Sequence, residues 1–435
     1  MLPVTTGKAI EAFSFPKLAP PVTGVVDSVV YTVRATVPAG TDLTKLFPSI
    51  VLSPNAIIAP GIDVAQDFTK PVSYTVTAMD SKTQPYLVTV SVASTIINGG
   101  SFVYMGNGAG NFYAVDGGTG IVKWRVSMGA AISASAFVAA GMVFTGSENG
   151  NIYALDAQSG TQRWKFSTGK SVLSSPVVSD RMLFAGSEDQ TLYALDVLTG
   201  TLRWKFATAG GVTSSPVVVN KVLYVGSKDQ TLYALNATTG GVNWKFGAGD
   251  VITSSPAVAN GLVYIGTSDY NLYTLDAGSG AIKWKFSTGG RVTSSPTVTN
   301  GLVYIGSEDK TFYAIDAATG ALKWKFSTGG KITGSAAVVS GIVYIGSEDK
   351  TFYALDAATG FVKWKFNSGD LISSSPIVYN GYVYISGQDT SLYCLNAATG
   401  LLRWRLPLDA KLVASPCLAT TDLVPVAASI SGGQQ

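Results

Sequence analysis

The eight tryptophans of this chain recur at a constant interval of 40 residues. A Gly lies four residues before every Trp, and a Tyr lies eleven residues before it. Such strict self-similarity marks a repeat protein, in which neighbouring copies stack to bury a shared core. The repeat positions are Trp124, Trp164, Trp204, Trp244, Trp284, Trp324, Trp364 and Trp404, with Gly120, Gly160, Gly200, Gly240, Gly280, Gly320, Gly360 and Gly400.

One unit, residues 291–330, contains four short runs rich in Val, Ile, Tyr, Phe and Thr, separated by Gly, Asn or Asp. The runs read VTSSPTVT, LVYIGS, TFYAIDA and ALKWKFS. Runs of this length and composition predict β-strands joined by tight turns. Four strands in 40 residues are typical of one blade of a β-propeller, so we predict an all-β fold with eight blades.

The first unit lacks its innermost strand, because residues 101–127 supply only SFVYMG, NFYAVD and IVKWRVS. The run KLVASPCLA at 411–419 matches the missing strand, so we expect it to pair into the first blade and close the ring. LVPVA at 423–427 reads as a surplus strand without an assigned place. Proline suits a strand edge that faces the channel, so we predict that the innermost strands contain Pro176, Pro216, Pro256, Pro296, Pro376 and Pro416.

Residues 1–95 share none of this period. Alternating runs such as VVYTVRATV and YLVTVSVAS, with turn signals between them, predict a small β-sandwich. The stretches VPAGTDLTKLFPSIVLSPNA and QDFTKPVSYTVTAMD resemble Ig-like modules that precede larger domains in bacterial surface proteins. We therefore predict an Ig-like domain at 1–95 and a propeller at 96–435, joined by a short linker near Ser94–Gly100.

The repeat motif AxDxxTGxxxW separates this propeller from others of similar period. WD40 blades contain Gly-His and Trp-Asp pairs, which this chain lacks, and kelch units are longer. The motif resembles the tryptophan-docking repeat of the PQQ-like propellers, which include the quinoprotein dehydrogenases and the BamB-type outer-membrane assembly lipoproteins. The resemblance covers about residues 100–427. Departures from the motif are Thr274 and Cys394 in place of Ala, and Asn236 and Asn396 in place of Asp.

Composition excludes several classes of chemistry. The chain contains no His, which removes the commonest general base and the commonest zinc ligand. Cys394 and Cys417 form no metal-ligand spacing and are predicted to be buried free thiols. A formal net charge of +3 gives no case for a nucleic-acid partner. No apolar run is long enough for a membrane span. The first residues lack a signal-peptide core, so the sequence allows either a cytoplasmic protein or a mature chain whose export signal was removed.

Half of the chain's 30 basic residues flank the tryptophans, and one follows every Trp. A basic side chain on an exposed outer strand blocks edge-to-edge pairing, which explains every copy equally. The alternative is a basic belt for an anionic polymer. The residues concerned are Lys123, Arg125, Arg163, Lys165, Arg203, Lys205, Lys245, Lys283, Lys285, Lys323, Lys325, Lys363, Lys365, Arg403 and Arg405.

The turns between one blade and the next differ among otherwise similar copies. Residues that vary between repeats are the ones able to form a specific binding surface. We interpret the charged residues of these turns as a candidate partner-binding rim around the channel mouth, with a solvated surface as the alternative. The rim residues are Lys170, Asp250, Arg291, Lys331, Asp370 and Lys411. Hairpins expected on the same face carry Glu188, Asp189, Asp229, Glu308, Asp309, Glu348 and Asp349.

The resemblance to quinoproteins raises PQQ with Ca²⁺ as a cofactor. This chain has no adjacent Cys pair, no inserted loop for a calcium cage and no Trp outside the docking motif. We therefore predict no catalytic, cofactor or metal site. The leading hypothesis is a monomeric, non-enzymatic binding or scaffolding protein of the bacterial cell envelope, located in the periplasm, at the outer membrane or outside the cell. Alternatives are a PQQ-dependent dehydrogenase and a glycan-binding propeller that uses Tyr270, Tyr379, Asn380 and Tyr382.

Overall fold

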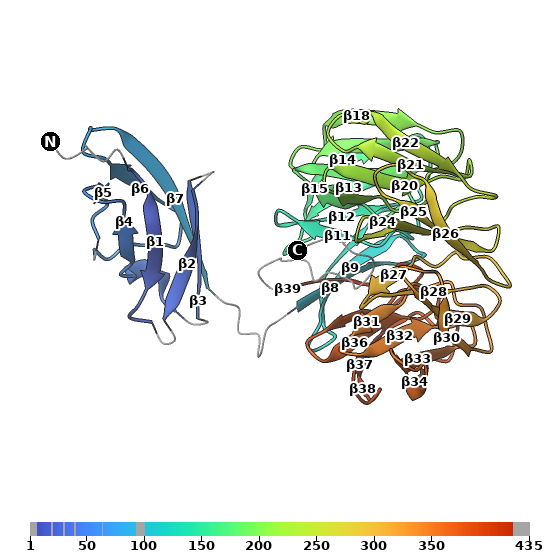
Figure 1. The fold of residues 1–435 in the computed structure, drawn as a ribbon. Coiled ribbons are helices and arrows are strands. Elements are labelled where there is room, and N and C mark those ends of the chain that lie inside the picture. The colour runs from blue at the N-terminus through green and yellow to red at the C-terminus, as the bar shows by residue number, and fades with distance from the viewer. Residues whose placement is uncertain are drawn as a thin grey trace. The chain divides into compact units, whose positions relative to one another are not determined.

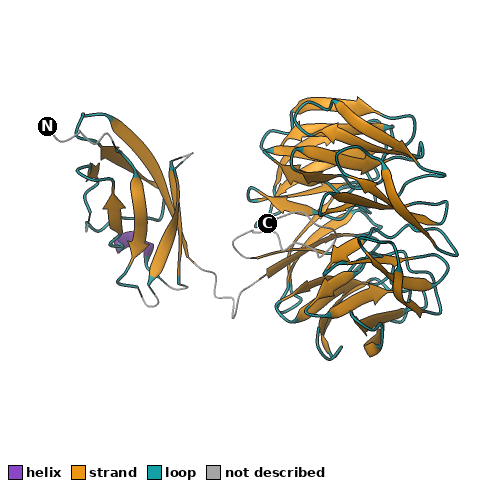
Figure 2. Ribbon diagram, in the orientation of Figure 1, coloured by secondary structure: helices purple, strands orange, loops and turns teal. Residues whose placement is uncertain are grey.

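The computed structural model describes residues 7–18, 21–28, 31–38, 41–62, 64–92 and 101–420. The chain divides into two compact units, Met1–Gly99 and Gly100–Gln435. The expected linker at 94–100 and the run at 423–427 lie outside the described residues. Almost all regular structure is strand, as Figure 2 shows. Among the described residues, no helix is long and apolar enough to cross a bilayer.

The first unit is a seven-stranded sheet of order β4-β1-β2-β3-β7-β6-β5, folded in a sandwich-like way. β2 belongs to both halves, because Val22 and Gly24 pair with β1 whereas Val25 and Asp27 pair with β3. Its elements are β1 (Ile10–Phe15), β2 (Val22–Asp27), β3 (Thr32–Val37), the 3-10 helix η1 (Leu43–Lys45), β4 (Ser49–Leu52), β5 (Ile57–Ala59), β6 (Val72–Thr77) and β7 (Thr83–Val92).

Aromatic rings fill the core of this unit. Phe13 meets Phe15, Phe68 and Tyr74 in edge-to-face contacts, with ring centroids 5.3 to 6.4 Å apart. Phe13, Phe15 and Tyr74 point inward at alternate strand positions, as the period of two in the sequence predicts. Burial of such rings is the main favourable contribution to the stability of a small sandwich.

The second unit is a ring of eight four-stranded blades (Figure 1). Each blade is an antiparallel meander, and both of its faces are covered by neighbouring blades. The predicted strand order is confirmed. The blade 1 strands are β8 (Ser101–Gly106), β9 (Asn111–Asp116), β10 (Val122–Ser127) and β39 (Cys417–Thr420); those of blade 2 are β11 (Phe137–Ala139), β12 (Met142–Gly146), β13 (Asn151–Asp156) and β14 (Gln162–Ser167).

Blades 3 to 8 follow the same plan in chain order. Their strands are β15 (Val177–Ser179), β16 (Met182–Ser187), β17 (Thr191–Asp196), β18 (Leu202–Ala207); β19 (Val217–Val219), β20 (Val222–Gly226), β21 (Thr231–Asn236), β22 (Val242–Gly247); β23 (Ala257–Ala259), β24 (Leu262–Gly266), β25 (Asn271–Asp276), β26 (Ile282–Ser287); β27 (Thr297–Thr299), β28 (Leu302–Gly306), β29 (Thr311–Asp316), β30 (Leu322–Ser327); β31 (Ala337–Val339), β32 (Ile342–Gly346), β33 (Thr351–Asp356), β34 (Val362–Asn367); β35 (Ile377–Tyr379), β36 (Tyr382–Ser386), β37 (Ser391–Asn396), β38 (Leu402–Pro407).

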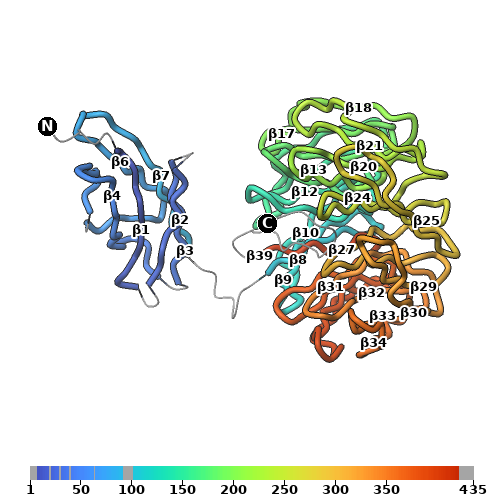
Figure 3. The backbone as a smooth tube through the Cα atoms, viewed as in Figure 1, coloured from blue at the N-terminus to red at the C-terminus, as the bar shows by residue number. Residues whose placement is uncertain are grey.

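The ring closes as the sequence predicts. β39 pairs antiparallel with β8, and Cys417 lies opposite Tyr104. In Figure 3 the red end of the described chain lies beside the blue-green β8. Chain segments about 300 residues apart in sequence thus complete one blade, so no blade edge stays open at the join.

One prediction about the innermost strands is wrong. Each of the six prolines lies immediately before its strand instead of within it; for example, Pro296 precedes β27. The innermost strands are therefore only three or four residues long. A second prediction holds in part, because both cysteines are free but only Cys394 is fully buried.

The meander gives the disc two distinct faces. The hairpin face carries the turn between the second and third strand of each blade and the connector that leads to the next blade. The turn face carries the other two turns, including the one that ends at the repeated Gly. The candidate rim belongs to the hairpin face, whereas the repeated Gly belongs to the turn face.

Candidate functional site

Each repeated Trp contacts the following blade in two ways. Its indole N–H donates to a backbone carbonyl 2.9 to 3.2 Å away in the next copy; Trp124, for instance, binds the oxygen of Ala157. Its ring covers the repeated Gly of that copy so closely that a Cβ on Gly160 would lie 2.8 Å from Trp124 Cδ2. The Trp and Gly positions therefore hold adjacent blades together.

A second aromatic residue supports the same carbonyl, and the sequence reasoning missed it. A Tyr on the second strand donates its hydroxyl to this oxygen over 2.9 to 3.1 Å in six blades. The available signal was an aromatic residue 20 positions before every Trp. The six residues are Tyr104, Tyr224, Tyr264, Tyr304, Tyr344 and Tyr384.

Most hairpin aspartates are occupied by structural contacts. Asp309 accepts hydrogen bonds of 2.7 Å from the Tyr313 hydroxyl and from the Gly289 N–H of the preceding connector. Burial and this hydrogen bond raise the pKa of Tyr313 to about 12, so the phenol stays a donor at neutral pH. Equivalent Tyr–Asp contacts recur from blade 3 to blade 8. These carboxylates brace the connectors and are poor candidates for catalysis.

In six blades the basic residue before the Trp pairs with an Asp in its own blade. Arg203 lies 2.6 Å from Asp196, and similar pairs occur in blades 1, 2, 5, 6 and 7. Where Asn236 replaces the Asp, Asn243 replaces the base. Most bases on this side of the Trp thus complete local ion pairs, which does not favour a basic belt.

Serines surround the centre of the ring. The backbone N–H of one Ser donates to the hydroxyl of the equivalent Ser in the next blade, over 2.8 to 3.0 Å, at seven consecutive junctions. This contact was also missed from the sequence, although a Ser recurs every 40 residues. The eight are Ser135, Ser175, Ser215, Ser255, Ser295, Ser335, Ser375 and Ser415.

The six candidate rim residues all lie in connectors on the hairpin face, at two adjacent positions. Lys170, Asp250 and Asp370 take the first position. Asp250 and Asp370 are partly buried, and each accepts the N–H of the next residue over 2.7 to 2.8 Å. These two carboxylates are therefore engaged by the backbone of their own connector.

The other three rim residues take the second position and are exposed bases. The carbonyl oxygens of Arg291, Lys331 and Lys411 each accept an N–H from a hairpin over 2.9 Å, so these bases border the hairpins. Lys331 also lies 2.7 Å from the Glu308 carboxylate, which raises the pKa of the lysine ammonium.

The rim carries a further ion pair between blades. Lys228 lies 2.5 Å from Glu188 of the preceding hairpin. Among the described ion pairs, Lys170, Arg291 and Lys411 have none, so they carry uncompensated positive charge on this face. The structure brings the rim residues onto one face but does not join them in a single cluster.

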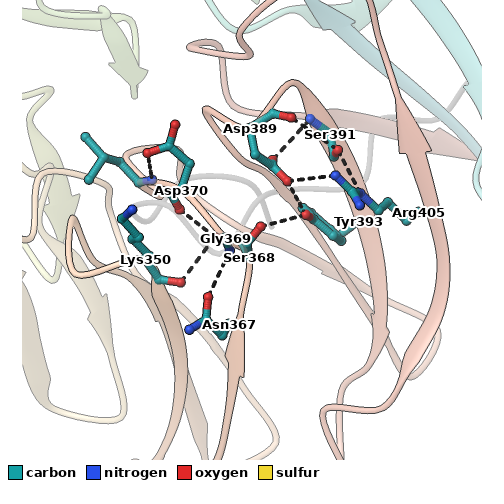
Figure 4. A network of polar contacts seen from close by, with 10 residues as sticks. Lys350, Asn367, Ser368, Gly369, Asp370, Asp389, Ser391, Tyr393 and Arg405 are labelled. Carbon is teal, nitrogen blue, oxygen red and sulfur yellow. Dashed lines mark hydrogen bonds and ion pairs between the residues drawn. The ribbon is translucent and has the colours of Figure 1, made fainter.

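Figure 4 shows how the connector and the hairpin divide their roles at the junction of blades 7 and 8. Asp389 faces Tyr393, which donates its hydroxyl, and Arg405 at 3.1 Å. Asp370 lies on the other side of Ser368, and its backbone oxygen accepts the Ser368 hydroxyl over 2.6 Å. The hairpin carboxylate is internal to the blade, whereas the connector residue lies at the rim.

Within the described residues, the acidic side chains do not gather as a calcium site beside PQQ would need. No group of three or more acidic, Cys or His side chains that could hold a metal occurs in the part of the chain that the structure describes. The chain has no adjacent cysteines, and every indole covers a Gly of the next blade. These donors do not fit the group, so no reaction step is derived through it.

Fold and contacts together define the class of this protein: an eight-bladed β-propeller built from tryptophan-docking repeats. The chain belongs to the family described as outer membrane protein assembly factor BamB, which it matches at residues 108–245, 198–291, 284–379 and 353–432. Residues 10–90 match a second family, described as SGBP, N-terminal. No curated protein is similar enough to count as a match.

Solved structures share the propeller. BamB from Moraxella catarrhalis has a TM-score of 0.58 and 19% identity, over 67% of this chain and 95% of its own. The computationally designed Ika8 protein has a TM-score of 0.60 and 17% identity, over 69% and 94%. The quinohemoprotein alcohol dehydrogenase ADHIIG from Pseudomonas putida HK5 has a TM-score of 0.56 and 16% identity, over 66% and 69%. At these identities the likeness concerns the fold alone.

Proposed function

We propose that this chain is a non-enzymatic binding or scaffolding protein of the bacterial cell envelope. It acts as a monomer and contacts a protein partner through the hairpin face of the ring. Its family includes an outer membrane protein assembly factor, which supports both an envelope location and a protein partner. An exported chain in the periplasm, at the outer membrane or outside the cell is consistent with this assignment.

One observation carries the proposal. The residues that repeat from blade to blade are engaged in contacts between and within blades, as for Trp324 with the Ala357 oxygen. The residues that vary lie on the rim, where Lys170, Arg291 and Lys411 expose bases that make no described ion pair. A binding surface must differ from a repeating scaffold, and these exposed bases favour an acidic patch on the partner.

A quinoprotein dehydrogenase is the second candidate, because the fold is shared with a quinohemoprotein alcohol dehydrogenase. The side chains that would hold calcium are not gathered in the described residues. Calorimetric titration with PQQ and Ca²⁺, together with a dye-linked dehydrogenase assay, tests it. We expect no stoichiometric binding and no turnover.

A glycan ligand is the third candidate. The match of the first unit to the SGBP N-terminal family is consistent with a glycan-binding context. On the ring, Tyr270 is exposed in a hairpin, which suits stacking on a sugar. Tyr382 is less available, because Arg403 lies over its ring at 4.1 Å. A glycan array separates this candidate from the leading proposal.

The direct test is affinity capture from a bacterial envelope extract by the full chain. A rim variant, Arg291→Ser, Lys331→Ser and Lys411→Ser, copies Ser171, which occupies the same connector position after blade 2. A control variant, Lys205→Ser, Lys285→Ser and Lys325→Ser, removes equal charge from the outer strands. We expect the rim variant to lose the captured protein and the control to keep it. Equal capture by all three would overturn the proposal.

A further inference from the structure

Three consecutive blades expose a large apolar residue at a position that is small or polar elsewhere. This position precedes the outer strand and follows the repeated Gly on the turn face. Phe361, Leu401 and Ile121 hold it in blades 7, 8 and 1, with 76%, 70% and 61% exposure. In the other five blades it holds Thr161, Thr201, Gly241, Ala281 and Ala321.

The next residue adds to the same surface, because Val362, Leu402 and Val122 are also exposed. Blades 7, 8 and 1 are neighbours around the closed ring, since Trp404 of blade 8 binds the Gly117 oxygen of blade 1. We call these six apolar residues and the bases that follow them on β34, β38 and β10 the seam sector. Exposed apolar residues grouped in this way mark interaction sites on protein surfaces.

Bases follow the apolar residues on all three strands. On each strand one base lies two residues after the exposed apolar residue and another lies four residues after it, so the two bases flank the Trp. Four of these bases form ion pairs: Lys123 with Asp116, Arg125 with Asp409, Lys363 with Asp356 and Arg405 with Asp389. Arg403 has no such pair among the described residues, because Asn396 replaces the Asp, and it stacks on Tyr382. Lys365 of blade 7 makes no ion pair among the described residues. The six bases are Lys363, Lys365, Arg403, Arg405, Lys123 and Arg125.

Charge and shape select the occupant. A second copy would bring its own Arg403 and Lys365 against the same uncompensated bases, which opposes self-association. The outer edge of a closed ring is convex, so three separate corners fit a deformable surface better than a folded protein. Apolar tips below a basic layer are the arrangement of interfacial anchors, in which the tips enter the acyl boundary and the bases meet anionic headgroups.

We propose that the seam sector docks the ring onto an anionic lipid surface. Phe361, Leu401 and Ile121 insert at the boundary of the acyl chains, and Arg403 and Lys365 contact phosphate groups. The three residues hold the same blade position on the turn face, so a membrane against that face meets all three. This surface is separate from the rim of the proposed function, and each can fail without the other.

The test is sedimentation of the full chain with vesicles of phosphatidylcholine containing about a third of phosphatidylglycerol, a composition with a clear surface potential. The apolar variant is Ile121→Thr, Phe361→Thr and Leu401→Thr, which copies Thr161 and Thr201 and is expected to keep the melting temperature. We expect its partition coefficient to fall more than about tenfold, because insertion depends on buried apolar area.

A matched control removes three exposed apolar residues outside the sector: Leu202→Gln, Ile282→Gln and Leu322→Gln, which copy Gln162 of blade 2. Binding by the control should equal wild type. Arg403→Asn recreates the Asn pair of blade 4 and should weaken binding about fivefold with anionic vesicles.

Three results would overturn the proposal. The first is wild-type protein that does not sediment with the anionic vesicles. The second is equal loss of binding in the apolar variant and the control. The third is a wild-type dimer in sedimentation velocity that the apolar variant dissociates, which would assign the surface to a second copy.

Discussion

The indole N–H of Trp404 donates a hydrogen bond of 3.1 Å to the carbonyl oxygen of Gly117, 287 residues earlier in the chain. The Trp404 ring also covers Gly120, where a Cβ would lie 2.8 Å from Cδ2. The contact that joins every other pair of blades therefore also joins the last blade to the first. Together with β39, it makes the ring continuous.

This contact predicts the effect of shortening the side chain. Trp404→Ala should lower the stability of the ring by roughly 3 kcal/mol, because a large, partly buried aromatic loses its packing on the next blade. Trp404→Phe keeps most of the packing and removes only the hydrogen bond, at a cost of about 1 kcal/mol. Trp364→Ala should resemble Trp404→Ala. Thermal unfolding checks these values, and an unchanged melting temperature in Trp364→Ala would contradict the role of the indoles.

The repeated Gly allows a comparison of backbone strain with steric overlap. Gly360 has a φ of 76°, and a Cβ there would lie 2.6 Å from Trp324 Cε3. Gly261 has a φ of 74° but no atom within 4 Å of its Cβ position. Gly261→Ala should therefore cost only about 1–2 kcal/mol of left-handed strain. Gly360→Ala should cost roughly 1–3 kcal/mol more, because the indole must also move.

Equal losses in the two variants, measured by denaturant unfolding, would show that the close approach of the Trp ring is unimportant.

Protonation of the turn aspartates predicts acid sensitivity. The hydrogen bond from Arg203 is the main cause that lowers the pKa of Asp196 to about 2, and Lys323 acts likewise on Asp316. An unfolded Asp has a pKa near 3.9, so these groups stabilise the fold above about pH 4. That stabilisation is lost as the pH falls from about 4 to about 2.

Asp196→Asn with Arg203→Asn copies Asn236 and Asn243 of blade 4, where the amide oxygen still accepts the turn N–H over 3.0 Å. This variant should lose a little stability at pH 7 and show a shallower decline below pH 4. Melting temperatures measured from pH 7 to pH 2 check it; a decline as steep as that of wild type would refute the assignment.

At the junction of blades 8 and 1, the carboxylate lies in the connector instead of in the hairpin. Blade 1 has Ala109 where the hairpins of blades 3 to 8 have Asp, and Asp409 stands where most connectors have Gly. Asp409 accepts bonds from Asn107, Asn111 and Tyr113 at 2.5, 2.8 and 2.6 Å, and it pairs with Arg125 at 2.9 Å. The Tyr113 hydrogen bond is the main cause that lowers the pKa of Asp409.

Asp409→Gly should therefore destabilise the ring by about 1–3 kcal/mol, because Tyr113 and its neighbours lose a charged acceptor. Adding Ala109→Asp restores the pattern of blades 3 to 8 and should recover most of the loss. Thermal unfolding of the single and double variants checks this. A double variant no more stable than the single would show that the two positions are not equivalent.

The sequence predicted the ring because its main fasteners are side chains that repeat at a fixed interval. Trp, Gly and the turn Asp each make the same contact in nearly every blade, so the same residue types recur every 40 residues and reveal the repeat. Other contacts could not be predicted, because the acceptor is a backbone carbonyl that no residue type encodes, as for Tyr304 and the Ala357 oxygen. The short innermost strands were missed because VTSSPTVT reads as a strand throughout, whereas only Thr297–Thr299 forms one.

The rim was harder to interpret than the ring. Sequence position placed Arg291 and Asp370 on one face, but it could not show that the Asp370 carboxylate accepts the Leu371 N–H. It also could not show that Asp309 is held by Tyr313. Charge on a variable loop indicates a surface, and only the contacts separate the groups that are engaged from those that remain available.

The central claim is that shared residues hold the ring and variable residues bind the partner. The most direct test measures both properties, melting temperature and capture from envelope extract, on two variants at a temperature where both are folded. Trp364→Ala should melt earlier and still capture the partner, whereas the Arg291, Lys331 and Lys411 serine variant should melt like wild type and lose it. A rim variant that captures normally, or a Trp variant that alone loses capture while folded, would contradict the account.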